Sequence, residues 1–96
     1  MRHEIVLSAE AVDDLSHLNA HVRSEVRDAI ETHLRHQPTR ASKSRIKRLR
    51  GLSRPQYRLR IGEVRVFYDV SEGIVEVLGI IAKSDVEAWL KKAGGT

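Results

Sequence analysis

The chain has 96 residues, of which 41% are hydrophobic and 4% aromatic, and this composition suits one domain over residues 1–96 with a core of Val, Ile and Leu. The absence of cysteine excludes a disulfide framework and any Cys-based metal site, and it fits a reducing, cytoplasmic setting. The net charge is +4, while no apolar run nears the roughly 20 residues of a membrane span and no signal-peptide core follows the N-terminus.

Two helices are predicted to follow a short N-terminal strand. The strand covers "HEIVLS", with Ile5 and Leu7 on one face. Ser8 is expected to cap the first helix and Asn19 the second. The second helix ends before Pro38 and carries an apolar stripe made of Val22, Val26, Ala29, Ile30, His33 and Leu34. Two helices joined by so short a link form a helical hairpin.

Residues 39–55 have no clear period, and they open the basic part of the chain. Residues 40–68 hold ten basic side chains and one acidic side chain, whereas the segments on both sides are net acidic. Ile46, Leu49 and Leu52 could anchor residues 39–55 to the core, which leaves the basic side chains outside. A basic cluster of this kind is typical of a surface that binds a polyanion, nucleic acid above all. The alternative is a solvated loop rich in Lys and Arg.

The stretch "YRLRIGEVRVFY" predicts a β-hairpin that turns at Gly62-Glu63. One face of this hairpin is apolar and holds Tyr57, Leu59, Ile61, Val64, Val66 and Tyr68. The other face holds Arg58, Arg60, Arg65 and Phe67. Arg60 lies directly opposite Arg65, and like charges in opposite positions destabilise a sheet. This second face is therefore expected to bind an anion, or else to pair with acidic residues such as Glu63 or Asp69.

A last strand and a C-terminal helix complete the predicted order β-α-α-β-β-β-α. The strand is "IVEVLGIIAK", which is apolar on both faces in part and is therefore expected to be central. The helix begins at Ser84, where Ser84 and Glu87 match a capping box, and Gly94-Gly95 suits its end. Trp89 is expected to pack in the core.

The arginine-rich face of the hairpin suits RNA scission that uses the 2′-hydroxyl as nucleophile. Such a site must take the hydroxyl proton, stabilise charge on the phosphoryl oxygens and protonate the leaving oxygen. Arg60 and Arg65 could bind one phosphate together, because the guanidinium fork binds phosphate oxygens in pairs. Arg58 would extend the track to a neighbouring phosphate, and Phe67 could stack on a base. The RNA backbone would also be held by the basic segment through Lys43, Arg45, Lys47, Arg48 and Arg50.

No metal site or cofactor is predicted. His17 and His21 stand four residues apart, but no H-E-x-x-H arrangement surrounds them, and the histidines are expected at the surface. The chain also lacks a Gly-rich phosphate loop, a nucleophile elbow and a carboxylate pair with clear spacing.

Together these features resemble the RelE/ParE superfamily, the toxin halves of bacterial type II toxin–antitoxin pairs. The resemblance covers almost the whole chain and rests on "DDLSHL", "VRSEVRDAIETHL", "KRLRGL" and above all "YRLRIGEVRVFYDV". It implies an α+β fold of the microbial RNase type, in which a helical hairpin packs on a twisted antiparallel sheet. It also implies a cognate antitoxin that wraps the toxin in a hetero-oligomer and covers the arginine-rich face.

In the RNA-cleaving branch of this superfamily, basic residues of the strand pair hold and activate mRNA in the ribosomal A site. Arg58, Arg60 and Arg65 match those positions. Many members of that branch end with a cluster of Arg or His and then a tyrosine, whereas this chain has "GIIAKSDVEAWL". Lys83 is the only basic residue there and is the expected proton-transfer group, while Glu87 stands where the tyrosine would be.

The predicted activity is that of a metal-independent endoribonuclease that cuts mRNA on the ribosome and thereby inhibits translation. Three alternatives share the pattern. A ParE-like poison of DNA gyrase would have the same fold and a protein target. A nucleic-acid-binding domain would use the basic surface without chemistry. A degenerate toxin would keep only the fold and the binding of its antitoxin.

Overall fold

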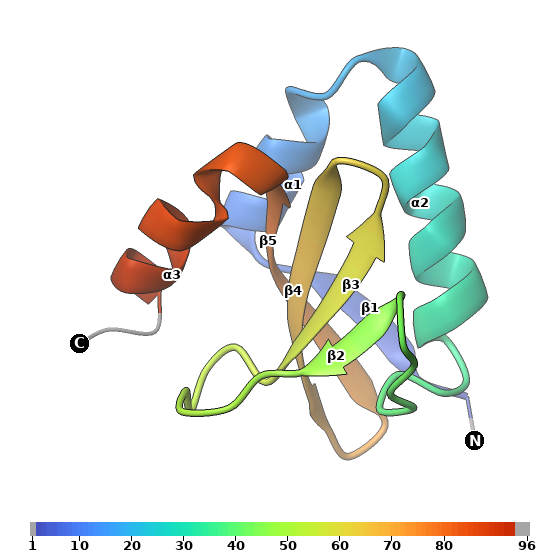
Figure 1. Ribbon diagram of the computed structural model, residues 1–96. Coiled ribbons are helices and arrows are strands. Elements are labelled where there is room, and N and C mark those ends of the chain that lie inside the picture. The colour runs from blue at the N-terminus through green and yellow to red at the C-terminus, as the bar shows by residue number, and fades with distance from the viewer. Residues whose placement is uncertain (1, 94–96) are drawn as a thin grey trace.

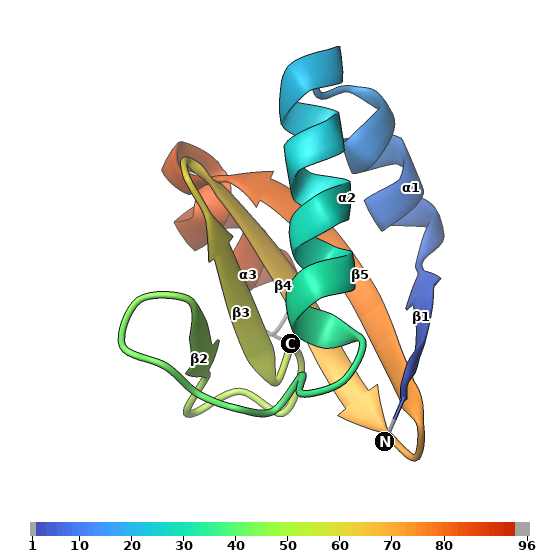
Figure 2. The same ribbon diagram turned by 90° about the vertical axis from the view of Figure 1, so that its right-hand side faces the viewer.

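A five-stranded sheet forms the middle layer of the fold in the computed structural model, which describes residues 2–93. In chain order the elements are β1 (Glu4–Leu7), α1 (Ala9–Ser16), α2 (Ala20–Leu34), β2 (Ile46–Arg48), β3 (Tyr57–Ile61), β4 (Val64–Ser71), β5 (Ile74–Ala82), η1 (Lys83–Asp85) and α3 (Val86–Ala93). The strands lie side by side in the order β1-β5-β4-β3-β2. Helices α1 and α2 lie on one face of the sheet, and α3 lies on the other (Figure 1, Figure 2).

Both predicted helix caps are confirmed. Ser8 Oγ accepts a hydrogen bond from the Ala11 amide at 3.1 Å, and Asn19 Oδ1 accepts one from the Val22 amide at 2.9 Å. Each bond satisfies a backbone donor that the first helical turn leaves without a partner. The helices then bury one stripe each against the sheet, made of Ala11 and Leu15 in α1 and of Val26, Ile30 and Leu34 in α2.

The core lies between this helical hairpin and the sheet. The inner face that the sequence predicts for the β3–β4 hairpin supplies much of it, because Leu59, Val66 and Tyr68 are fully buried there. The rings of Tyr57 and Tyr68 stack with centroids 5.5 Å apart, and the Tyr68 hydroxyl donates to the Pro38 carbonyl at 2.6 Å. The predicted α+β class is confirmed.

Two features of the sheet differ from the sequence-based prediction. The first is that β1 pairs parallel to β5, so the sheet is mixed and not antiparallel throughout. The second is β2, a strand within the segment that was expected to lack regular structure. Three residues are too short for a recognisable period, and the strand forms because its backbone pairs with β3 from Ile46 opposite Leu59 to Arg48 opposite Tyr57. The observed order is therefore β-α-α-β-β-β-β-α, with a 3₁₀ turn before the last helix.

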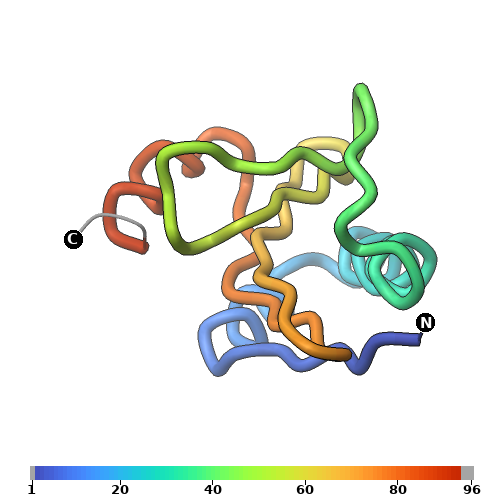
Figure 3. Tube along the Cα trace, turned by 90° about the horizontal axis from the view of Figure 1, so that it is seen from below, coloured from blue at the N-terminus to red at the C-terminus, as the bar shows by residue number. Residues whose placement is uncertain are grey.

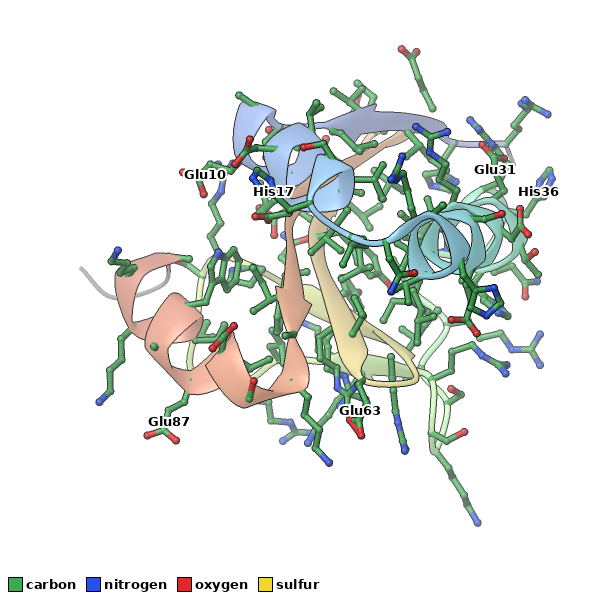
Figure 4. The ribbon with its side chains drawn as sticks, turned by 90° about the horizontal axis from the view of Figure 1, so that it is seen from above. Glu10, His17, Glu31, His36, Glu63 and Glu87 are labelled. Carbon is green, nitrogen blue, oxygen red and sulfur yellow. The ribbon has the colours of Figure 1, made fainter. Side chains whose placement is uncertain are left out.

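The predicted capping box at the C-terminal helix is wrong. Residues Lys83–Asp85 form the 3₁₀ turn η1, so α3 begins at Val86, and within residues 2–93 no hydrogen bond joins Ser84 to Glu87. Figure 4 shows Glu87 pointing away from the sheet. The tight turn takes up the residues that were expected to form the first turn of the helix. The predicted end at Gly94-Gly95 lies outside the described residues.

The loop between β2 and β3 covers residues 49–56. Figure 3 shows residues 49–56 running out on the side of the sheet where α3 lies. Arg54 anchors this loop, because its guanidinium approaches Asp69 at 3.5 Å and Glu76 at 3.2 Å. In the part of the chain that the structure describes, no helix is long and apolar enough to cross a membrane.

Candidate nucleic-acid interface

The β3–β4 hairpin has the register that the sequence predicts. Arg58 lies opposite Phe67, and Arg60 lies opposite Arg65. Gly62 makes the turn possible, because its φ of 56° falls in the left-handed region that glycine tolerates best. The three arginines therefore share the face of the sheet that points away from the helical hairpin.

The unpredicted strand β2 adds two cations to this face. Lys47 lies opposite Arg58. The Arg60 amide donates to the Arg45 carbonyl at 2.9 Å, which continues the same register by one residue. Five basic side chains thus gather on three neighbouring strands and on the residue that precedes β2, and they are called the basic face below: Arg45, Lys47, Arg58, Arg60 and Arg65. The alternation around Ile46 is the only signal in the sequence for this placement.

The arginines of the basic face have no acidic partners in the structure. Within residues 2–93, no carboxylate lies within 4.0 Å of Arg58, Arg60 or Arg65. Asp69 is engaged elsewhere, because it contacts Arg54 and accepts a hydrogen bond from the Gln56 amide at 2.7 Å. The alternative that Glu63 or Asp69 neutralises Arg60 and Arg65 is therefore wrong. The face retains its positive charge.

Arg65 is the most constrained of these side chains. It is 7% exposed, and its Nη1 donates to the Gly62 carbonyl at 2.7 Å and to the Val64 carbonyl at 3.1 Å. These bonds fold the guanidinium back over the turn and fix its position. Arg60, directly across from it, is exposed.

Arg58 is intermediate in exposure between the buried Arg65 and the exposed Arg60. It is half-buried, and its Nε is enclosed without a hydrogen-bond acceptor in the described part of the chain. Burial lowers the pKa of the Arg58 guanidinium from its usual value, and the neighbouring charges of Arg65 and Arg60 lower it further. Arginine nevertheless stays charged in proteins. A buried donor without an acceptor is costly, so an anion that supplied one would be stabilised here.

Phe67 does not fill its predicted role. Its side chain is 1% exposed, and its ring stacks on Trp89 of α3 with centroids 4.8 Å apart and an interplanar angle of 19°. The expected stacking of Phe67 on a base is therefore wrong for this arrangement, because the indole covers the ring. Trp89 packs on the sheet, but it is half-buried and lies on the face opposite the main core, so the prediction of a core position is wrong.

Lys83 lies at the edge of the basic face. Its amide donates to the Glu63 carbonyl at 2.8 Å, which continues the β4–β5 pairing past Ala82. Ile81 is the partner of Arg65, and side chains two residues apart on a strand point to the same face. Lys83 therefore leaves the strand on the side of Arg65, where it is exposed and lines a shallow hollow with Glu63 and Ser84. Figure 4 shows Glu63 at the turn between β3 and β4.

The other predicted RNA-binding residues are not all on this face. Arg48 lies on the opposite side of β2, where its Nη1 donates to the Tyr57 hydroxyl at 3.2 Å and its guanidinium lies 5.0 Å from the ring centroid. Lys43 and Arg50 are exposed in the loops on either side of β2.

His33, which the sequence analysis includes in the apolar stripe of the second helix, is half-buried on α2. Burial lowers its pKa, and the charge of Arg45 lowers it further. The neutral imidazole is therefore favoured beside the start of β2.

The comparisons with known proteins identify a family model that covers most of the chain and two solved structures with a similar fold. Residues 5–86 match the family model for the ParE toxin of the type II toxin–antitoxin system, parDE. A chain of the RelB–RelE antitoxin–toxin complex from Methanococcus jannaschii has a similar fold, with a TM-score of 0.66 and 19% identity over 88% of this chain and 96% of that chain. A chain of the archaeal RelE–RelB complex from Pyrococcus horikoshii OT3 has a TM-score of 0.61 and 27% identity over 86% and 97%. No curated protein matches.

Proposed function

Because this chain belongs to the ParE toxin family of type II toxin–antitoxin systems, we propose that it is a RelE-like toxin: a cytoplasmic endoribonuclease that cleaves mRNA on the ribosome and inhibits translation. The observation that carries the proposal is the basic face, on which Arg58, Arg60 and Arg65 lie together without a carboxylate partner in residues 2–93. A phosphodiester backbone is the anion that fits such a row of guanidinium groups best.

The proposed reaction is attack of the ribose 2′-oxygen on the adjacent phosphorus. The 2′-oxygen forms a bond to phosphorus, the bond to the 5′-oxygen breaks, and a 2′,3′-cyclic phosphate and a 5′-hydroxyl end result. Water takes the proton of the 2′-hydroxyl. Lys83, as an ammonium group, gives a proton to the leaving 5′-oxygen.

Arg60 and Arg65 stabilise the charge that develops on the phosphoryl oxygens in this proposal. Arg65 is held by two backbone carbonyls, so its charge is in place before the substrate arrives, and such preorganised charge is the most effective kind in catalysis. Arg45, Lys47 and Arg58 hold the neighbouring phosphates. The exposed Lys43 and Arg50 extend the contact along the RNA.

In this proposal the ribosome orients the mRNA substrate for the toxin. Few acids and bases lie near Lys83, so the chemistry depends on a substrate that is already oriented, and the proposal assigns that orientation to mRNA bound in the A site. The partner of the free toxin is a cognate antitoxin, with which it forms a hetero-oligomer. Both solved relatives are toxin–antitoxin complexes, and this supports the assignment.

A ParE-like poison of DNA gyrase is the second candidate, because the matching family model is that of the ParE toxin. Induced expression in growing cells separates the two functions. We expect labelled amino-acid incorporation to stop within minutes, before thymidine incorporation falls, and new 5′ ends to map inside translated messages. If DNA synthesis stops first and messages stay intact, the chain is a gyrase poison. If both continue, it is a degenerate toxin.

A further inference from the structure

The turn between β3 and β4 anchors two groups of the proposed reaction through its backbone. The Gly62 carbonyl accepts a hydrogen bond from Arg65 Nη1 at 2.7 Å, and the next carbonyl, that of Glu63, accepts one from the Lys83 amide at 2.8 Å. In the proposed reaction Arg65 stabilises the phosphoryl charge and Lys83 protonates the leaving oxygen. Both are thus tied to consecutive peptide groups of one tight turn, and the side chain of Glu63 leaves the chain at the same place.

The Glu63 carboxylate is exposed and free of cations in the part of the chain that the structure describes. Within residues 2–93, no Lys, Arg or His nitrogen lies within 4.0 Å of it. Figure 4 shows the side chain at the turn, pointing away from α1 and α2. A solvent-exposed carboxyl group is ionised at neutral pH, so it can accept a proton.

This carboxylate shares a hollow with the Lys83 side chain. The hollow has a volume of about 510 Å³ and is lined by Glu63, Ala82, Lys83 and Ser84. The two charged groups do not form an ion pair across it, because their nitrogen and oxygen atoms are more than 4.0 Å apart. The attacking and leaving oxygens of a phosphoryl transfer lie roughly in line. A base and an acid for such a transfer must therefore stand apart, with the phosphate between them.

The other carboxylates near Lys83 in the chain are directed elsewhere. Asp85 lines a different hollow, together with Asp14 of α1. Glu87 points away from the sheet (Figure 4). Among the described residues, Glu63 is therefore the acidic side chain that lies in the same hollow as Lys83.

We propose that Glu63 is the final acceptor of the 2′-hydroxyl proton, an inference that rests on the proposed function and adds a residue to it. As the 2′-oxygen attacks phosphorus, the hydroxyl gives its proton to water, and this water gives one of its own protons to the Glu63 carboxylate. Lys83 gives its proton to the leaving 5′-oxygen. Solvent then restores both groups, because the new carboxylic acid loses its proton to water and the amine regains one.

Single-turnover cleavage on programmed ribosomes with Glu63→Gln tests this proposal. At saturating toxin the rate should fall at least about tenfold, the low side of the range for a lost base. Binding to the programmed ribosome should not weaken, because the variant removes a negative charge beside the basic face. Glu72→Gln is the matched control, since it makes the same change in the exposed turn between β4 and β5, at the opposite end of the sheet. It should cleave at the wild-type rate.

The pH profile separates a proton acceptor from a structural role. Between about pH 6 and about pH 9 the wild-type rate should change little, because exposed carboxylates are ionised and exposed ammonium groups protonated there. The rate of Glu63→Gln should instead rise with pH, by up to about tenfold per pH unit, because hydroxide replaces the lost base. Glu63→Asp, which keeps a carboxylate, should cleave more slowly than the wild type and keep its flat profile.

Three results would overturn the proposal. The first is a Glu63→Gln protein with the wild-type rate and profile. The second is a rate that falls by the same factor at every pH, because a change of charge or packing is then the cause. In both cases the wild-type chain still cuts the message, so the proposed function stands without Glu63. The third is a wild-type chain that leaves the message intact on ribosomes, which overturns the proposed function and this inference together.

Discussion

Arg60 and Arg65 are opposite each other on neighbouring strands and yet have different environments. Arg65 is 7% exposed and is bound to two carbonyls of the turn. Arg60 is exposed. Removal of Arg65 would therefore disturb both the hairpin and the charge of the basic face, whereas removal of Arg60 changes the charge alone. Arg60 is the residue at which function can be separated from folding.

Lys83 is the other residue whose role can be isolated. It is exposed at the end of β5 and makes no side-chain bond in residues 2–93. Lys83→Met should lower the rate of RNA cleavage by at least about tenfold, the low side of the range for a lost acid or base, with no change in the urea midpoint. Lys91→Met on α3 is the matched control and should keep full activity. A Lys83→Met protein that cleaves at the wild-type rate would remove Lys83 from the mechanism.

At the scale of elements, α3 packs on the sheet through Trp89. None of its residues is fully buried, and Trp89 lies on Phe67. Gly79 makes this approach possible, because a Cβ at this position would lie 2.5 Å from Trp89 Cζ2. The close packing of α3 on β5 thus depends on the absence of a side chain at Gly79.

Gly79→Ala should displace the indole, because two heavy atoms cannot remain 2.5 Å apart. We expect a loss of about 1–3 kcal/mol in the free energy of unfolding and a red shift in the emission of Trp89, the only tryptophan. The same substitution in a Trp89→Ala background should cost less, which urea melts followed by circular dichroism would show. An equal cost in both backgrounds would contradict the role given to Trp89.

The Tyr68 hydroxyl ties β4 to the end of the helical hairpin through the Pro38 carbonyl. Tyr68→Phe should reduce the free energy of unfolding by about 1–3 kcal/mol, because a buried acceptor then loses its donor. Tyr57→Phe is the variant for comparison, because the Tyr57 hydroxyl accepts a hydrogen bond from the charged Arg48 at the edge of the sheet. A neutral effect of Tyr68→Phe in urea melts would show that water reaches Pro38.

The buried Tyr68 hydroxyl also predicts that the protein loses stability at alkaline pH. Burial raises the pKa of Tyr68 above its ordinary value near 10, and the charge of Tyr57 adds to the shift. The unfolded chain therefore releases the Tyr68 proton first, and stability falls as the pH rises through that range. Urea midpoints of the Tyr68→Phe protein should fall less steeply above about pH 10.

The β3–β4 hairpin could be predicted from the sequence, because a strict alternation of apolar and charged residues fixes both its faces and its register. Strand β2 could not be predicted, because its three residues are too few to show a period. The parallel pairing of β1 could not be predicted either, because no local sequence pattern specifies it. Phe67 was assigned to RNA because the sequence cannot show that Trp89 of the last helix covers its ring. The failed capping box at Ser84 has a similar cause, since the 3₁₀ turn continues the pairing of β5 with β4.

At the scale of the whole molecule, the positive charge is concentrated in residues 40–68, which contain the basic face, while the segments on both sides are net acidic. This distribution predicts a strong salt dependence for RNA binding, because each neutralised phosphate releases counterions. For binding of single-stranded RNA, Lys47→Gln should reduce the slope of log affinity against log salt by about 0.7. Lys92→Gln on α3 should leave the slope unchanged. Equal slopes for both variants would place the RNA elsewhere.

Cleavage on ribosomes programmed with a defined mRNA is the most direct measurement of the proposed activity. The wild-type chain should cut the message in the A site in a single turnover, and should leave the same RNA intact when ribosomes are omitted. Arg60→Gln should lower the rate by at least about 10²-fold, as for a lost donor to a developing charge, with a urea midpoint equal to or slightly above that of the wild type, because a like-charge pair is removed. Arg40→Gln, outside the basic face, should cleave normally. An Arg60→Gln protein with the full rate, or a wild-type chain that leaves the message intact on ribosomes, would contradict the basic face as the site of RNA cleavage.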